Sequence, residues 1–145
     1  LGALAVQMVH EASLLHDDIL DGAPTRRGRA TVAAQGGIAA ALVGGDHLLT
    51  AAYRAALETV DPRFVRLFVE AVERTVAGEA AQGRSAGRPL SENQYLEMLE
   101  HKSGALFGCA MALGPSLLGQ PDVARVDWQL DVQWLAEHGV QVPAR

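Results

Sequence analysis

The chain has 145 residues, of which 49% are hydrophobic and 20% charged, and its formal net charge at pH 7 is −5. These values are typical of a folded soluble domain and argue against nucleic-acid binding, because nucleic-acid-binding proteins usually present a basic face. The one cysteine, Cys109, excludes an internal disulfide, and no apolar stretch reaches the ~20 residues of a membrane span, so we expect a cytoplasmic protein.

Apolar residues at helix spacing open the chain. Residues Leu1 to Asp21 show the spacing of one helix face, and Gly22-Ala23-Pro24 should end that helix. The polar stretch from Pro24 to Thr31 is predicted to be a loop. Because Leu1 already lies within a helical pattern and is not a methionine, we expect further residues before it.

The remaining helices are predicted from capping residues and from the Gly and Pro residues between them. Strand-like alternation does not compete with them in any segment. We therefore predict an all-α protein, an antiparallel helical bundle in which a ligand site would lie between facing helices. The expected bounds are Gly37 to Leu57, Asp61 with Pro62 to Gln82, Ser91 with Gln94 to Leu113 (ended or kinked by Gly114-Pro115), and Val123 to Glu137.

Three carboxylates lie within about one turn at the end of the first predicted helix: Asp17, Asp18 and Asp21. Asp17 and Asp21 are four residues apart and share a helix face, where like charges repel. Acidic groups near a helix C-terminus also oppose the helix dipole. A bound Mg²⁺ would remove both penalties, because Mg²⁺ prefers oxygen ligands and typically takes one or two carboxylates plus phosphate oxygens. The alternative is a solvated acidic helix end.

Two adjacent arginines, Arg26 and Arg27, follow this acidic turn. Guanidinium groups are the preferred planar donors to phosphate oxygens. Carboxylates for a metal, followed by paired arginines on the next loop, form the pattern that a metal–diphosphate site needs.

The run from His10 to Val32 resembles the first aspartate-rich region of the trans-isoprenyl diphosphate synthases, the polyprenyl synthetase family. In that family the aspartates hold Mg²⁺ against the allylic diphosphate, the first arginine contacts the allylic diphosphate and the second contacts isopentenyl diphosphate. The resemblance assigns these roles to Asp17, Asp18, Asp21, Arg26 and Arg27.

The resemblance continues downstream. Gly45-Asp46-His47-Leu48-Leu49 is similar to a Gly-Asp-x-Leu-Leu run that starts the family's next helix, although Asp46 could equally brace helix ends. Gly78-Glu79-Ala80-Ala81-Gln82 is similar to a Gly-Glu-x-x-Gln motif whose polar side chains face the pocket. Lys102-Ser103 stands where the family has Lys-Thr or Lys-Ser. Buried lysine is rare unless paired, and in the family its anion is the substrate diphosphate; the alternative is a surface lysine that reaches solvent.

The resemblance implies a prenyltransferase that condenses an allylic diphosphate with isopentenyl diphosphate. Ionisation of the allylic diphosphate places negative charge on the leaving group, which Mg²⁺ and cationic side chains would stabilise. A nucleophilic side chain is not needed. The implied catalytic residues are Asp17, Asp18, Asp21 and Lys102, and the implied substrate-binding residues are Arg26, Arg27, Gln82, Lys102 and Ser103.

Two small residues precede the acidic turn by one helical turn: Ala12 and Ser13. A prenyl tail anchored by its diphosphate near Asp17 would extend past them. In the family, bulky aromatic residues at these positions stop elongation early. We therefore expect an open tunnel and a medium- or long-chain product.

The resemblance covers residues 1–119, and residues 120–145 are divergent. The family's upstream Gly-Gly-Lys-x-x-Arg-Pro motif and its second Asp-Asp-x-x-Asp motif are not recognised; Asp127 and Asp131 suit a solvated helix face better. We therefore expect a partial synthase domain, inactive alone, from a parent that is a homodimer. A non-catalytic partner subunit and a class I terpene cyclase are the alternatives, although Arg26-Arg27-Gly28 favours the elongating synthases.

Overall fold

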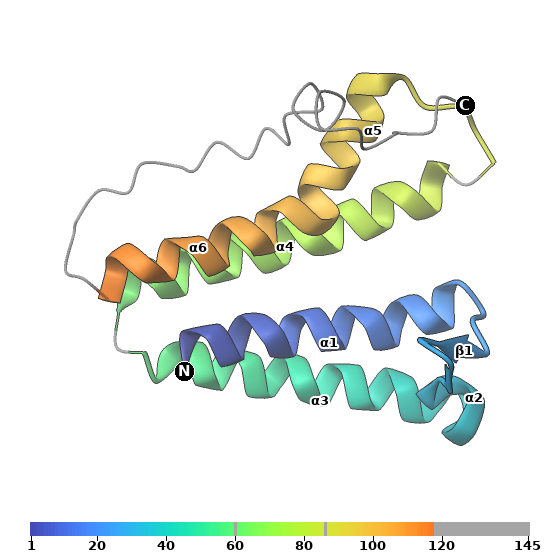
Figure 1. Cartoon of the computed structure of the whole chain (residues 1–145), viewed down its shortest axis with the longest axis horizontal. Coiled ribbons are helices and arrows are strands. Elements are labelled where there is room, and N and C mark those ends of the chain that lie inside the picture. The colour runs from blue at the N-terminus through green and yellow to red at the C-terminus, as the bar shows by residue number, and fades with distance from the viewer. Residues whose placement is uncertain (60, 86, 118–145) are drawn as a thin grey trace. The chain divides into compact units, whose positions relative to one another are not determined.

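The computed structural model describes residues 1–59, 61–85 and 87–117 (Figure 1). The chain divides into two compact units, Leu1–Phe68 and Val69–Arg145, and helix α4 crosses the boundary between them. In chain order, the described elements are α1 (Gly2–Leu20), β1 (Thr25–Arg26), β2 (Arg29–Ala30), α2 (Val32–Gly36), α3 (Ile38–Leu57), α4 (Pro62–Ser85), α5 (Glu92–Leu99), the π-helix η1 (Glu100–Gly104) and α6 (Ala105–Leu117).

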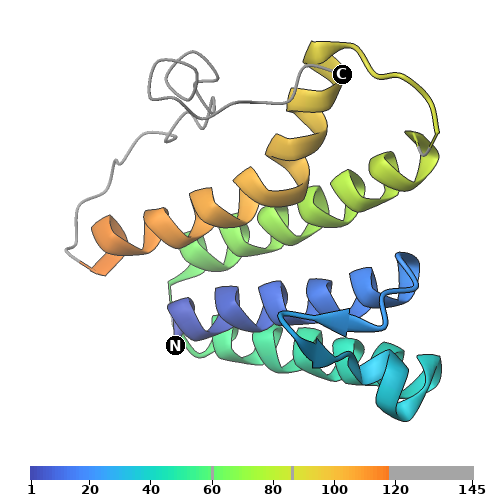
Figure 2. The same cartoon turned by 45° about the vertical axis from the view of Figure 1, so that its right-hand side comes forward.

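Helices α1 and α3 lie side by side and antiparallel in the first unit (Figures 1 and 2). The distance between packed helices depends on the side chains at the contact, and most of those buried here are small. The two helices can therefore pack closely. Besides Asp18, the buried residues are Gly2, Ala5, Val9 and Ala12 on α1 and Ala41, Gly45, Ala52, Ala55 and Ala56 on α3.

Aromatic side chains join the start of α4 to α3. The fully buried ring of Phe68 meets Tyr53 edge-on, with 5.6 Å between ring centroids, and lies 6.0 Å from Phe64. Edge-to-face pairs at this distance stabilise a core beyond their buried area. The carboxylate of Asp61 accepts a hydrogen bond from the Arg63 amide at 2.9 Å, so the predicted N-cap of this helix is confirmed.

The predicted loop from Pro24 to Thr31 is wrong in part, because it contains a two-stranded hairpin. Thr25 pairs with Ala30, and Arg26 pairs with Arg29. The two turn residues, Arg27 and Gly28, both have positive φ, 50° and 75°. That conformation suits a two-residue hairpin, but Arg27 is an uncommon residue for it, so the turn lacked a clear sequence signal.

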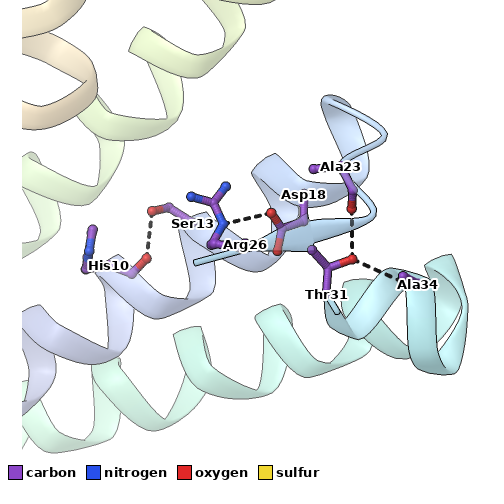
Figure 3. A network of polar contacts seen from close by, with 7 residues as sticks. All are labelled: His10, Ser13, Asp18, Ala23, Arg26, Thr31 and Ala34. Carbon is purple, nitrogen blue, oxygen red and sulfur yellow. Dashed lines mark hydrogen bonds and ion pairs between the residues drawn. The ribbon is translucent and has the colours of Figure 1, made fainter. Parts of the chain in front are cut away.

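A short helix, α2, follows the hairpin and was also missed. The Thr31 hydroxyl donates to the Ala23 carbonyl at 2.8 Å and accepts from the Ala34 amide at 3.1 Å (Figure 3). Thr31 therefore caps α2 and connects its start to Ala23, in the turn that follows α1. Five residues are too few for a periodic apolar pattern, which explains why α2 was not predicted.

The second unit begins within α4, and its α6 lies alongside α4 and runs antiparallel to it (Figures 1 and 2). The predicted capping box is confirmed: the Ser91 hydroxyl accepts from the Gln94 amide, and the Gln94 side chain accepts from the Ser91 amide. The helical stretch that it opens was expected to run to Leu113 and to be ended or kinked by Gly114-Pro115. It continues through Gly114-Pro115 to Leu117, so the expected bound is wrong, and it contains the unpredicted π-turn η1.

The all-α prediction is confirmed over the described residues, with the hairpin as a small exception. Cys109 is buried as expected, and this burial raises the pKa of its thiol to about 11. Within the same residues, no helix is both long and apolar enough to cross a membrane. The predicted helix from Val123 to Glu137, with Asp127 and Asp131, lies outside the described part of the chain.

Candidate active site

The three aspartates of the acidic turn differ in their surroundings. Asp17 is half-buried, Asp18 is only 5% exposed, and Asp21 is exposed as the C-cap of α1. The buried carboxylate of Asp18 accepts a hydrogen bond from Arg26 Nε at 2.8 Å (Figure 3). A buried carboxylate needs such a partner, because an unpaired charge is costly to remove from water.

The hairpin gives the two adjacent arginines different positions. Arg26 lies on β1, and the fold of the chain through Gly22 and Ala23 brings it back to Asp18, eight residues earlier. Arg27 lies at the exposed turn of the hairpin. One arginine is therefore held against the acidic turn, whereas the other faces solvent.

The donor set suits a divalent metal that arrives together with a diphosphate. In the described ranges, no three His, Cys, Asp or Glu side chains are grouped as a ready-made metal cage. Asp17 and Asp21 nevertheless share one face at the end of α1, and Mg²⁺ commonly binds through one or two carboxylates plus phosphate oxygens. Asp21 is exposed and Asp17 is half-buried, so both are more accessible to the predicted metal than Asp18, which is only 5% exposed.

The Gly-Asp-x-Leu-Leu run lies in the middle of α3, which begins at Ile38, and not at a helix start. Asp46 therefore does not brace a helix end. Its carboxylate lies 3.6 Å from Nε2 of His16, and that nitrogen is also 3.4 Å from the Leu42 carbonyl oxygen. This run of α3 therefore packs against α1 at His16, the residue directly before Asp17.

A second polar cluster lies in the second unit, around Lys102. Its Nζ lies 2.8 Å from Oε1 of Glu79, and it donates to Oε2 of Glu79 at 3.0 Å and to Oε1 of Gln82 at 2.9 Å. The Lys102 side chain is 23% exposed and is paired, as is usual for a lysine that is partly buried. The anion beside it in this structure is Glu79, whereas the resemblance implied the substrate diphosphate. The contact of Glu79 with Lys102 was not predicted, although Glu79 stands in the motif with Gln82.

Three other predicted site residues have the following surroundings. Ala12 is fully buried, and the Ser13 hydroxyl donates to the His10 carbonyl at 2.8 Å (Figure 3). Ser103 is exposed. Their roles in chain length and substrate binding stay predictions.

Sequence comparison identifies the family in which this arrangement of motifs occurs. A family model described as "Polyprenyl synthetase" matches residues 2–132. The chain belongs to the polyprenyl synthetase family. This match extends past Gly119, the last residue that the resemblance was expected to cover.

Named relatives and solved structures of polyprenyl synthetases agree with this assignment. Nonaprenyl diphosphate synthase of Mycobacterium tuberculosis is 35% identical over 118 residues, which are 81% of this chain and 35% of that protein. A (2E,6E)-farnesyl diphosphate synthase of Mycobacterium bovis is 35% identical over 128 residues, 86% of this chain and 36% of that protein. Polyprenyl synthase of Caulobacter crescentus, solved with calcium and isoprenyl diphosphate, has a TM-score of 0.79 and 32% identity over 85% of this chain and 38% of that one.

The chain thus spans about a third of the length of these relatives. The similarity to the solved synthase confirms the predicted helical fold of the isoprenoid synthase type. Both relatives are named prenyl diphosphate synthases, which favours the elongating synthases over a terpene cyclase. Their products differ, so kinship alone does not decide the product length.

Within this polyprenyl synthetase chain, the predicted site residues form two groups. Asp17, Asp18, Asp21, Arg26 and Arg27 belong to the first unit, and Gln82, Lys102 and Ser103 to the second. In the first unit Arg26 contacts Asp18, and in the second Lys102 contacts Gln82, whereas Arg27 and Ser103 are exposed. The convergence of the two groups on one cavity stays a prediction.

The packing of His16 gives a first testable consequence. A Cβ added at Gly45 would lie 2.2 Å from Nε2 of His16, whereas one added at Gly44 would meet only Leu15 Cδ1, at 3.6 Å. We expect Gly45→Ala to displace the imidazole ring and to lower the free energy of unfolding by about 1 kcal/mol. Gly44→Ala should be neutral or stabilising, since alanine favours helix. Urea unfolding measures both variants.

The His16→Ala background supplies the control for this prediction. Without the ring, the added methyl group at Gly45 has room, so Gly45→Ala should no longer destabilise the protein. An equal loss of stability in both backgrounds would show that His16 is not what Gly45 accommodates.

Proposed function

We propose that this chain is the part of a prenyltransferase that binds an allylic diphosphate and ionises it for condensation with isopentenyl diphosphate. The observation that carries the proposal is the acidic turn at the end of α1 with Arg26 held against it by the hairpin. Family membership and the names of the relatives support it.

Each charged group has a separate task in this proposal. Asp17 and Asp21 would hold Mg²⁺, which when bound stabilises negative charge on the leaving diphosphate. The positive charges of Arg26 and Lys102 stabilise the negative charge of the allylic diphosphate, and Arg27 contacts isopentenyl diphosphate. The bond from the allylic carbon to the diphosphate oxygen breaks, and the electron pair leaves with pyrophosphate.

The alkene of isopentenyl diphosphate then supplies the electron pair of the new carbon–carbon bond. A proton is lost from the adduct, and the departed pyrophosphate is the base that accepts it. Protein side chains therefore bind, orient and shield, and none forms a covalent bond with substrate.

Inorganic pyrophosphate tests the first step without requiring turnover. Isothermal titration calorimetry of the 145-residue chain should give binding in the presence of Mg²⁺ and little or none in EDTA, because the acidic turn repels an anion unless a metal neutralises it. Binding of equal strength in EDTA, or an absence of binding with Mg²⁺, would contradict the proposal.

The small residues before the acidic turn lead to a prediction on product length. We propose that Ala12 lines the path of the growing prenyl tail. Ala12→Phe should shorten the product, because a phenyl ring overfills a packed site. The measurement is the product distribution from isopentenyl diphosphate in a chimera, in which this chain replaces the matched segment of the Mycobacterium tuberculosis nonaprenyl diphosphate synthase.

Ala3→Phe is the matched control, because Ala3 is an exposed residue of the same helix and the substitution is identical. It should leave the product unchanged. If Ala12→Phe keeps its helical circular dichroism and its product length, then Ala12 does not line the tunnel.

We also propose that the parent synthase is a homodimer. Large apolar side chains on α3 remain exposed, among them Ile38, Val43 and Leu57. Light scattering on the purified parent synthase tests this, and a monomeric mass at micromolar concentration would contradict it.

A further inference from the structure

Lys102 is held by two acceptors on one face of α4. Glu79 and Gln82 are three residues apart, so their side chains share a helix face. Both carboxylate oxygens of Glu79 lie within 3.0 Å of the Lys102 ammonium, and Oε1 of Gln82 accepts from it at 2.9 Å. A lysine ammonium has three donors on a flexible stem, so several simultaneous acceptors are what fixes its direction.

The backbone that carries Lys102 is also held close to α4. A Cβ added at Gly78 would lie 2.4 Å from the Lys102 amide nitrogen and 2.7 Å from its Cα, so only glycine permits this approach. Lys102 lies in the π-turn η1, and the first residue of that turn, Glu100, is ion-paired with Arg74 of α4. π-Turns inside helices are frequent at functional sites.

The chemistry of Glu79 argues against a direct contact between this residue and a diphosphate. Its carboxylate is an anion that would repel another anion, and it is only 19% exposed beside Lys102. Its contacts instead order the lysine before any ligand binds. Ordering a long side chain in advance removes that cost from the binding step.

We propose that Glu79 is a positioning residue for Lys102, and that the segment from Gly78 to Gln82 is a holder for this lysine and not itself a diphosphate ligand. Gly78 admits the backbone, while Glu79 and Gln82 fix the ammonium. This inference rests on the proposed function only for the statement that a diphosphate reaches Lys102.

The sequence makes a direct test possible, because Lys102 is the only lysine in the chain. Selective ¹⁵N,¹³C-lysine labelling therefore gives one side-chain ammonium resonance in an NMR spectrum. In the ligand-free protein, we expect a protected, slowly exchanging signal that Glu79→Gln shifts or broadens. Glu73→Gln, an equal charge change at an exposed position of the same helix, should leave the signal unchanged. An unaltered Lys102 resonance in Glu79→Gln would overturn the proposal.

Pyrophosphate with Mg²⁺ supplies the second readout. Glu79→Gln should weaken binding roughly three- to tenfold, the range that corresponds to ordering one long side chain. In the Lys102→Ala background the same substitution should have no further effect, which a general loss of stability would not reproduce. Tighter binding by Glu79→Gln would show that Glu79 competes with the ligand, and would overturn the positioning role.

The two hypotheses fail in different ways. If wild-type protein shows no response to pyrophosphate but Glu79→Gln still disturbs the ligand-free Lys102 signal, then the proposed function fails and the positioning of Lys102 stands. If pyrophosphate binds with Mg²⁺ and Glu79→Gln changes neither the signal nor the affinity, the positioning role fails and the proposed function stands.

Discussion

A single methyl group added at Gly78 is expected to lower the free energy of unfolding by about 3 kcal/mol, the upper end of the range for overpacked sites. The atoms that it would meet at 2.4 and 2.7 Å are the backbone nitrogen and Cα of Lys102. Rotation of a side chain cannot relieve a clash with backbone. The turn η1 would have to move away from α4, and Lys102 would then lose its contacts with Glu79 and Gln82.

Gly83 supplies the matched control on the same helix. A Cβ added there meets nothing within 4 Å, and its φ is not in the left-handed region. Gly83→Ala should therefore raise the free energy of unfolding, by roughly 0.5–1 kcal/mol, because glycine is the poorer helix former. Urea unfolding followed by circular dichroism compares the two. Similar midpoints for Gly78→Ala and Gly83→Ala would mean that η1 does not pack against α4 as described.

The long helices were predictable because their signals are local. Apolar spacing, the Asp61 cap and the Ser91–Gln94 capping box each act within a few residues along the chain, and the structure confirms them. The predicted bound at Leu113 was wrong, because Gly114-Pro115 lies within the last described helix, which continues to Leu117.

The features that escaped prediction depend on contacts between distant residues or on unusual backbone. The π-turn at Lys102 adds one residue to a helical turn, and apolar periodicity does not reveal such an insertion. The hairpin turn at Arg27 has positive φ at a residue that seldom adopts it. Glu79 and Lys102 are 23 residues apart, so nothing local marks them as partners.

Spacing and resemblance predicted the residues of the candidate site, but they did not predict how the surroundings of these residues differ. Sequence reasoning grouped Asp17, Asp18 and Asp21 as equivalent metal ligands, and it gave Arg26 to the substrate. Burial separates them: Asp18 is 5% exposed and is paired with Arg26, whereas Asp21 is exposed. Spacing along a helix gives the face of a residue and not its depth.

Replacement of Asp18 and of Asp21 by asparagine should therefore give opposite signatures. Asp18→Asn removes the charged partner of Arg26 and should lower the free energy of unfolding by about 2 kcal/mol, as for loss of a charge-assisted hydrogen bond. The loss is moderate because the Arg26 side chain is 36% exposed, so water compensates part of it. Asp21→Asn should be neutral or slightly stabilising, since it removes a like charge four residues from Asp17.

For pyrophosphate binding in the presence of Mg²⁺, Asp21→Asn should have the larger effect of the two substitutions. Asp21→Asn should weaken binding by about a hundredfold. This is the upper end of the range for residues that only support a metal ligand, and the loss of a proposed direct ligand should cost at least as much. Asp18→Asn should act mainly through the position of Arg26, so it should add little once Arg26→Gln is present, both in calorimetry and in urea unfolding. Additive losses in that double variant, or a hundredfold loss from Asp18→Asn alone, would make Asp18 a metal ligand in its own right. A stable Asp21→Asn protein that has lost Mg²⁺-dependent binding would instead place the metal on the helix face that Asp17 and Asp21 share.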